Sequence, residues 1–196
     1  TVSVFFGGWY TQSGFGPRET WKEMREKLTS GERVGKEFTD MQGTPYIMQR
    51  EIWLSSRRSP CTAPPFGSLT AVSLVTGKTL WDVPLGTSEG LEKIGIPPLP
   101  PDTGMANLGG AITTAGGLVF IGATLDAYLR AFDVDTGKEL WKFKLPAAGK
   151  ATPMTYLGRD GRQYVVIAAG GDGKSWGKAD SVMAFALPMT APKAHP

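Results

Sequence analysis

The sequence predicts an all-β protein assembled from repeated antiparallel units, and three observations support this fold class. The 196 residues include 26 glycines and 15 prolines, and this share of helix breakers is well above average usage and disfavours a helical bundle. Hydrophobic residues make up 41% and aromatic residues 10% of the chain, which suffices for a packed core and excludes a disordered chain. Third, a segment with a strand–turn–strand pattern occurs twice.

The N-terminal part, residues 1–66, is predicted to be a strand remnant followed by an insertion. Residues 1–10 alternate like a strand from the first residue, with no initiator Met and no signal peptide. Such a start is typical of a chain that begins inside a domain. We therefore expect a piece of a longer polypeptide.

One helix is predicted within this insertion, over residues 17–29. The proline at its start suits the first helical position, and Trp21, Met24 and Leu28 fall on one face. These apolar side chains are expected to pack rather than to carry chemistry. Residues 30–66 show no regular period and are predicted to be irregular.

The repeat comprises residues 69–85 and 129–145, which align without gaps and are identical at 8 of 17 positions. Both copies contain the block TGKxLW between two predicted strands. Gly77 and Gly137 supply the positive φ that a type I turn with a G1 bulge requires. The offset of 60 residues exceeds the usual propeller repeat of about 40–50, and the loop at 86–110 accounts for the excess.

Further strands surround the second copy, at 116–124, 162–171 and 181–188. The last of these resembles a degenerate third copy of the repeat. Short antiparallel strands in repeated sets, with a tryptophan after each TGK turn, predict the blades of a β-propeller. We expect Trp81 and Trp141 to pack between blades.

Charge and rare residues exclude several classes of function. The net charge is only +3 and acidic residues interleave with basic ones, so nucleic-acid binding is not expected. No apolar run approaches the roughly 20 residues that span a bilayer. Cys61 is the only cysteine and His195, beside the C-terminus, the only histidine, which disfavours a disulfide, a cysteine metal site and a histidine-based triad. Asp133 and Asp135 lack the spacing of a calcium loop and are expected to be turn residues.

The second repeat copy resembles the tryptophan-docking repeat of the pyrroloquinoline-quinone (PQQ) dehydrogenases. Four further blocks narrow this resemblance to the C-terminal third of the membrane-bound glucose and quinate/shikimate dehydrogenases of Gram-negative bacteria. The repeat block occupies residues 131–146. The four further blocks, in chain order, occupy residues 41–46 (MQGTPY), 61–74, 107–124 and 151–171. The resemblance extends over nearly the whole chain from Met41 onward.

The resemblance implies an eight-bladed propeller that holds PQQ and calcium in its central channel and oxidises a sugar or cyclitol hydroxyl. This would occur in the periplasm, with electrons passing to ubiquinone through an N-terminal anchor in the inner membrane. Residues 67–196 would supply about three blades, and three blades cannot close a ring, so the remaining blades of the same polypeptide are expected as partners. The family's catalytic aspartate, which takes the hydroxyl proton while hydride passes to PQQ, lies upstream with the calcium ligands. No catalytic or metal-binding residue is therefore expected in this chain.

One substrate-mouth position follows from the resemblance. The family usually has AGGHG after the strand that ends here at Ala169, and Asp172 stands in place of the histidine. A carboxylate accepts hydrogen bonds and repels anions, so Asp172 would favour neutral polyols or sugars. Lys174, with Lys178 nearby, would offset that bias and admit a carboxylate substrate. The alternative is that Asp172 is simply a turn residue between glycines.

Asn107, Gly109 and Gly110 form a second candidate group, for cofactor binding. The paired glycines permit close approach of the backbone, which a buried ring cofactor would exploit. The alternative is an ordinary loop that precedes a strand.

Two other functions remain open from the sequence. A non-catalytic propeller scaffold shares PQQ-like repeats and binds partner peptides at its blade edges, but it does not need the blocks that begin at Cys61, Asn107 and Ala151. A free-standing 196-residue protein would need a mate to complete its ring.

Overall fold

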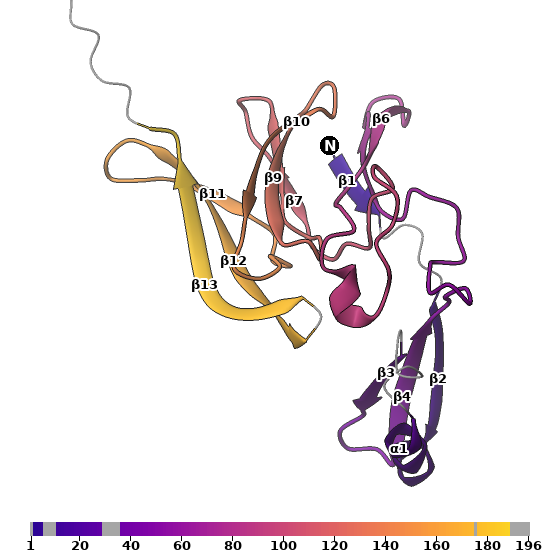
Figure 1. Ribbon diagram of the computed structural model, residues 1–196. Helices are drawn as coiled ribbons and strands as arrows, with labels where there is room; N and C mark the ends of the chain where they lie inside the picture. Colours follow the sequence, from indigo (N-terminus) through magenta and orange to yellow (C-terminus); the bar gives the residue numbers. More distant parts are fainter. Residues whose placement is uncertain (1, 6–10, 29–35, 175, 189–196) are drawn as a thin grey trace, which may run out of the picture.

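The computed structural model describes residues 2–5, 11–28, 36–174 and 176–188, which form antiparallel sheets, one α-helix and one short 3₁₀ helix (Figure 1). Three sheets stand beside one another and follow the repeat, and a fourth belongs to a separate lobe (Figure 1). The predicted all-β class with one helix is confirmed. No helix in these ranges is long and apolar enough to cross a bilayer.

The second sheet is a four-stranded unit whose strands are neighbours in the order in which they follow one another along the chain. Gly137, at φ 71°, forms the tight turn between its last two strands. These two strands are the second copy of the repeat. The strands are β7 (Ala111–Thr113), β8 (Leu118–Ile121), β9 (Tyr128–Asp133) and β10 (Glu139–Lys144).

The first and third sheets are three-stranded versions of the same unit. The last two strands of the first sheet are the first copy of the repeat. In the third sheet, the last strand occupies the position that β9 has in the second sheet, as the degenerate third copy predicts. The first sheet consists of β1 (Val2–Phe5), β5 (Ser68–Val72) and β6 (Thr79–Pro84). The third consists of β11 (Met154–Leu157), β12 (Gln163–Lys174) and β13 (Gly177–Ala186).

The indole of Trp81 joins the first sheet to the second. Its Nε1 donates a hydrogen bond of 2.9 Å to the carbonyl oxygen of Val134, in the turn after β9. The ring lies directly over Gly137, where an added Cβ would sit 2.7 Å from an indole carbon. The expected packing of this tryptophan between blades is confirmed.

Apolar side chains fill the spaces between the repeat sheets. Trp141 packs edge-on against Phe185 of the third sheet, with ring centroids 5.4 Å apart, so this second tryptophan also lies between sheets. The core between the first and second sheets contains Leu69, Leu85, Val119, Ile121, Ala123 and Phe132. The core between the second and third contains Leu129, Leu145, Ile167 and Ala169.

The insertion forms a small lobe of its own, with a three-stranded sheet and the helix (Figure 1). Trp21 of the helix lies over Gly16, where a Cβ would come within 2.0 Å of the indole, and Ile47 beside it is fully buried. Glycine thus makes room for an indole here as well. The elements are β2 (Thr11–Pro17), α1 (Arg18–Lys27), β3 (Lys36–Asp40) and β4 (Tyr46–Ile52), in the order β2-β4-β3.

The prediction that residues 30–66 are irregular is wrong for two segments. Both β3 and β4 lie in this range, and β4 pairs with β2 on its other edge. The predicted helix is confirmed, but its apolar face is only partly covered, since Met24 is exposed. Residues 6–10 of the predicted first strand lie outside the described residues, as does His195.

The connections of the repeat sheets fall at two opposite ends, because alternate turns of antiparallel strands lie at opposite ends. The TGK turns at Gly77 and Gly137 occupy one end. The turns at 114–117 and 158–162 lie at the same end as the TGK turns. The remaining connections lie at the opposite end, here named the loop end, together with the 3₁₀ helix η1 (Leu91–Ile94). The loop end comprises residues 86–110, 122–127, 145–153, 171–174 and 176–177.

The docking of Trp81 predicts different costs for the same substitution at two equivalent glycines. Gly77 and Gly137 have φ of 69° and 71°, but a Cβ at Gly77 would meet no atom within 4 Å. In the 196-residue chain, Gly77→Ala should cost about 1–2 kcal/mol for left-handed backbone. Gly137→Ala should cost about 1–3 kcal/mol more through overpacking. Urea unfolding measures both losses, and equal losses would contradict the docking.

Candidate functional site

Both groups of predicted site residues reach the loop end. Asn107, Gly109 and Gly110 directly precede β7, whereas Asp172 and Lys174 lie at the end of β12. The first and second sheets approach each other at β1 and β7, and blades converge toward the axis of a ring. The loop before β7 therefore lies on the inner side of the array.

The loop between β10 and β11 links the two groups by backbone hydrogen bonds. Ala123 donates to the carbonyl oxygen of Gly149 at 2.8 Å. Ala148 accepts from Gly171 at 3.0 Å and donates to the carbonyl oxygen of Trp176 at 2.9 Å. The β8–β9 turn, this loop and the tip of the β12–β13 hairpin therefore form one connected layer.

Asn107 is a buried polar side chain of this layer, with only 2% of its surface exposed. Its backbone forms an isolated bridge with Thr124, and its Nδ2 donates a long hydrogen bond of 3.4 Å to the carbonyl oxygen of Met105. The buried Oδ1 receives no hydrogen bond from any described residue. Because an unsatisfied buried acceptor is costly, this atom suits an N–H or O–H donor from a ligand or water.

Gly109 and Gly110 allow the close approach that the sequence predicts, and what approaches them is the neighbouring loop. A Cβ at Gly109 would lie 2.8 Å from the carbonyl oxygen of Lys150, and one at Gly110 would lie 2.3 Å from Oγ1 of Thr152. Gly109 also has a φ of 152°. The two glycines thus pack the loop before β7 against the loop before β11.

Asp172 holds the tip of the β12–β13 hairpin. Its Oδ1 accepts a hydrogen bond of 2.9 Å from the backbone N–H of Trp176, a contact typical of aspartate in turns. The carboxylate is exposed at the loop end. The backbone of Lys174 ends β12, but its side chain lies outside the described residues, and Lys178 is exposed on β13 opposite Gly171.

Trp176 anchors this hairpin tip to the rest of the loop end. The indole packs against an apolar cluster that lies beneath residues 86–106, and Nζ of Lys150 lies 5.6 Å from the ring centroid. The hairpin that carries Asp172 is thereby fixed by side-chain packing as well as by the bonds to Ala148. The cluster consists of Phe66, Leu91, Ile96, Leu99, Met105 and Leu125.

A buried ion pair between Asp126 and Arg130 organises the β8–β9 turn. Asp126 is 1% exposed, and its Oδ2 accepts from the backbone N–H and the hydroxyl of Thr87 at 2.8 and 3.0 Å. The guanidinium of Arg130 also donates to Oγ1 of Thr124 at 2.9 Å and to Glu139 at 3.0 Å. This network therefore ties the start of the long loop at 86–106 to the second sheet.

The charge of Asp126 is stabilised despite its burial. Burial is the largest single influence and by itself raises the pKa of Asp126. Arg130 opposes this effect through its hydrogen bonds and its charge, and Thr124 and Thr87 add further hydrogen bonds. Together these interactions outweigh burial, so the pKa of Asp126 lies below its ordinary value of 3.8. A second tie reinforces the same loop, because Nζ of Lys144 donates to Glu89 and, at 2.8 Å, to the carbonyl oxygen of Asp126.

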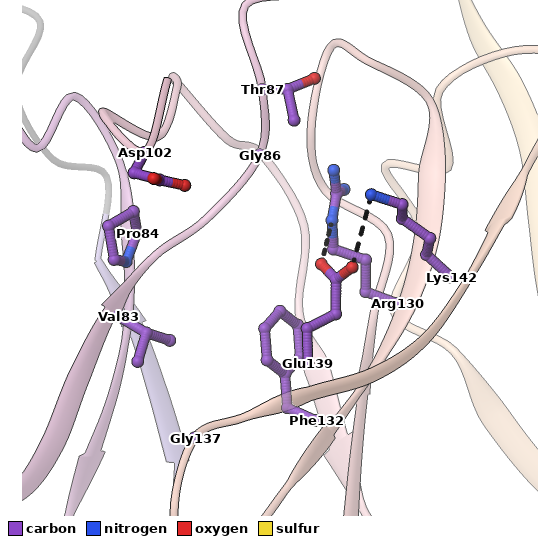
Figure 2. Close-up of a pocket in the computed structure, with 10 residues that line it drawn as sticks. All are labelled: Val83, Pro84, Gly86, Thr87, Asp102, Arg130, Phe132, Gly137, Glu139 and Lys142. Atoms are coloured by element: carbon purple, nitrogen blue, oxygen red, sulfur yellow. Dashed lines mark hydrogen bonds and ion pairs between the residues drawn. The ribbon is translucent and has the colours of Figure 1, made fainter. Parts of the chain in front are cut away.

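A groove of about 320 Å³ lies beside this network, between β6 and the strands β9 and β10 (Figure 2). Figure 2 shows Glu139 between Arg130 and Lys142, at 3.0 and 3.6 Å. Val83 and Pro84 line the opposite wall. Because Asp126 and Glu139 together neutralise Arg130 and Lys142, we interpret the groove as a seam between two sheets rather than as a ligand site.

Sequence reasoning missed Asp126, Arg130 and Trp176. One signal was available, because Arg130 places a charge in an apolar strand where the other repeat copy has Thr70, and a buried charge requires a partner. No local pattern identifies Trp176, since its contacts come from segments far away in the sequence.

Comparisons with known proteins agree with this geometry. A family model described as "PQQ: Glucose/ethanol/alcohol dehydrogenase, beta-propeller domain" matches residues 10–165. A probable quinate dehydrogenase (quinone) of Xanthomonas campestris pv. juglandis is 46% identical over 88% of this chain and 22% of its own length. The quinoprotein glucose dehydrogenase of Escherichia coli is 39% identical over the same shares.

One solved structure shows a similar fold. The quinohemoprotein alcohol dehydrogenase from Comamonas testosteroni superposes with a TM-score of 0.52 over 98% of this chain and 26% of its own, at 22% identity. The chain belongs to the β-propeller family of the PQQ-dependent quinoprotein dehydrogenases. It spans about a fifth of the length of the curated relatives that it matches.

Of the predicted cofactor-binding residues, Asn107 alone has a polar atom that would suit PQQ. The buried Oδ1 of Asn107, which lacks a donor, suits an N–H group such as the pyrrole of that cofactor. Gly109 and Gly110 do not form an open cradle, because the neighbouring loop occupies the space beside them. Within the described ranges, no group of three or more His, Cys, Asp or Glu side chains is placed to hold a metal ion.

Removing the buried carboxylate is predicted to destabilise the loop end. Asp126→Asn should lower the free energy of unfolding by about 3–5 kcal/mol, because it leaves Arg130 buried with only the partly exposed Glu139 as a countercharge. The pKa of Asp126 is lower in the folded state, so its stabilisation is present above the unfolded value and is lost as pH falls through the folded value. The variant should lack this part of the pH dependence.

Urea unfolding between about pH 7 and pH 3 measures both effects. Asp135→Asn is the matched control, since Asp135 is exposed in the TGK turn at the opposite end. A loss for Asp126→Asn no greater than that for Asp135→Asn would contradict the assigned role.

Proposed function

We propose that this chain is the C-terminal part of a PQQ- and calcium-dependent dehydrogenase that oxidises a hydroxyl of a sugar or cyclitol, of the glucose or quinate/shikimate type. The observation that carries the proposal is the identity of 39–46% with quinate and glucose dehydrogenases over most of the chain. The docking of Trp81 on Gly137 and the orphaned acceptor of Asn107 support it.

Bound PQQ supplies the two-electron oxidation of the alcohol, and the protein positions it. In this chain, Asn107 would donate or accept at the cofactor through its buried amide, and Asp172 would accept hydroxyl hydrogens of the substrate at the mouth. Lys174 would add positive charge beside Asp172. The catalytic base and the calcium ligands would be supplied by the part of the polypeptide outside this chain.

The remaining blades would cover surfaces that are open here. Val182 on β13 is 72% exposed and Leu157 on β11 is 73% exposed, although both belong to sheet strands. Such edges and faces are a liability unless another sheet covers them. We further propose that the complete enzyme is attached to the inner membrane, faces the periplasm and passes electrons to ubiquinone.

The denatured mass of the native polypeptide in its source cells tests this proposal first. We expect a mass several-fold above 21.0 kDa, and PQQ-dependent dye reduction with glucose or quinate after addition of PQQ and calcium. A long polypeptide without PQQ-dependent activity would favour a propeller scaffold. A mass near 21.0 kDa would contradict the proposed dehydrogenase function unless a second chain supplies the missing blades.

Asp172→His in the full-length enzyme is predicted to shift substrate preference. Loss of the fixed negative charge should lower the KM for quinate several-fold relative to that for glucose, because a carboxylate repels an anionic substrate. Steady-state kinetics with both substrates measure the shift. Asp135→His, in the TGK turn at the opposite end, is the control and should leave both values unchanged. If both substrates behave alike in the Asp172 variant, Asp172 is a turn residue only.

A further inference from the structure

Lys150 lies between the two candidate loops. It belongs to the loop that connects β10 with β11, and its carbonyl oxygen is the atom against which Gly109 packs. Ala148 of the same loop is bonded to Gly171 of β12 and to Trp176 in the tip of the hairpin that carries Asp172. The backbone of Lys150 is therefore held from both sides and sits near the start of β11, at the loop end.

The ammonium group of Lys150 has an aromatic neighbour and no carboxylate partner. Its Nζ lies 5.6 Å from the ring centroid of Trp176, and among the described residues it forms no ion pair with an aspartate or glutamate. By contrast, Lys144 and Lys142 pair with Glu89 and Glu139. As a whole residue, Lys150 is also half-buried.

An ammonium held this way is suited to an anion. The indole face restrains the cation without neutralising it, and a charge-assisted hydrogen bond to a carboxylate is stronger than one between neutral groups. Asp172 is bonded to the backbone of the same Trp176. Asp172, which can accept hydrogen bonds from hydroxyl groups, and Lys150, which can donate to a carboxylate, are thus both held at the tip of one hairpin.

We propose that Lys150, restrained by Trp176, is a carboxylate-binding residue of the active-site mouth. This inference rests on the function proposed above. The carboxylate belongs either to a polyhydroxy acid substrate such as quinate or to the PQQ cofactor, which also bears carboxylates. The two sources share one chemistry and are separated by experiment.

The test uses the full-length protein with Lys150→Gln, which removes the charge at similar length, and Lys150→Arg, which keeps it. Lys138→Gln is the matched control, because Lys138 is exposed in a TGK turn at the opposite end. Three quantities are measured: the affinity of the apoprotein for PQQ by fluorescence titration, the affinity for quinate by calorimetry, and the KM for quinate and for glucose.

Lys150→Gln is expected to weaken quinate binding and raise its KM by roughly tenfold or more, with glucose unaffected, if the substrate supplies the carboxylate. If the cofactor supplies it, PQQ affinity falls by a similar factor and both substrates shift together. Lys150→Arg should retain most of the affinity in either case. Unchanged PQQ and quinate affinities in Lys150→Gln, or equal losses in Lys150→Arg, overturn the proposal.

Failure of the proposed function gives a different result. If the wild-type protein shows no PQQ-dependent turnover, the proposed dehydrogenase function is refuted. Calorimetry with quinate does not depend on turnover, so it still decides the role of Lys150. If the wild-type protein binds neither quinate nor PQQ, both the proposed dehydrogenase function and the proposed role of Lys150 are overturned.

Discussion

The arrangement of the repeat sheets depends on how the indole of Trp81 is seated. The ring covers Gly137 of the next sheet while its N–H bonds to Val134, so one side chain fills the gap between sheets and satisfies its own donor. Glycine at 137 therefore meets two demands, the left-handed turn and the space for the ring. Because this contact holds the sheets at the TGK end, the opposite end is free to be built from loops.

The loops need a different kind of support, since they lack the regular hydrogen bonding of strands. Asp126 provides it by accepting hydrogen bonds from Thr87 and binding Arg130 in a site where neither charge reaches water. Burying one charge alone is prohibitive, so the burial of Asp126 depends on Arg130, and Arg130 in turn has Asp126 and Glu139 as its countercharges. Asn107 and the hairpin of Asp172 rest on the layer that this pair organises.

Sequence reasoning succeeds here where contacts are periodic or local. The TGK turns, the docking tryptophans and the positions of the later strands follow from the repeat. It fails for β3 and β4, because the sheet depends on the non-local pairing of β4 with β2. In addition, Trp21 fills a space that glycines, rather than an apolar period, leave open. At the site, the close approach at Gly109 was predictable, but its partner was not, since the carbonyl of Lys150 reaches it only through the tertiary fold.

The two docking tryptophans carry the same sequence block but occupy different surroundings. Trp81 has a glycine turn to cover, whereas Trp141 is 39% exposed and meets Phe143 and Phe185. The difference lies in the following sheet, because the described part of the third sheet ends after β13 without a fourth strand and TGK turn. Each unit is thus completed by the unit that comes after it. In a closed ring every sheet has a following sheet, so every docking tryptophan can be covered, in agreement with the β-propeller family to which this chain belongs.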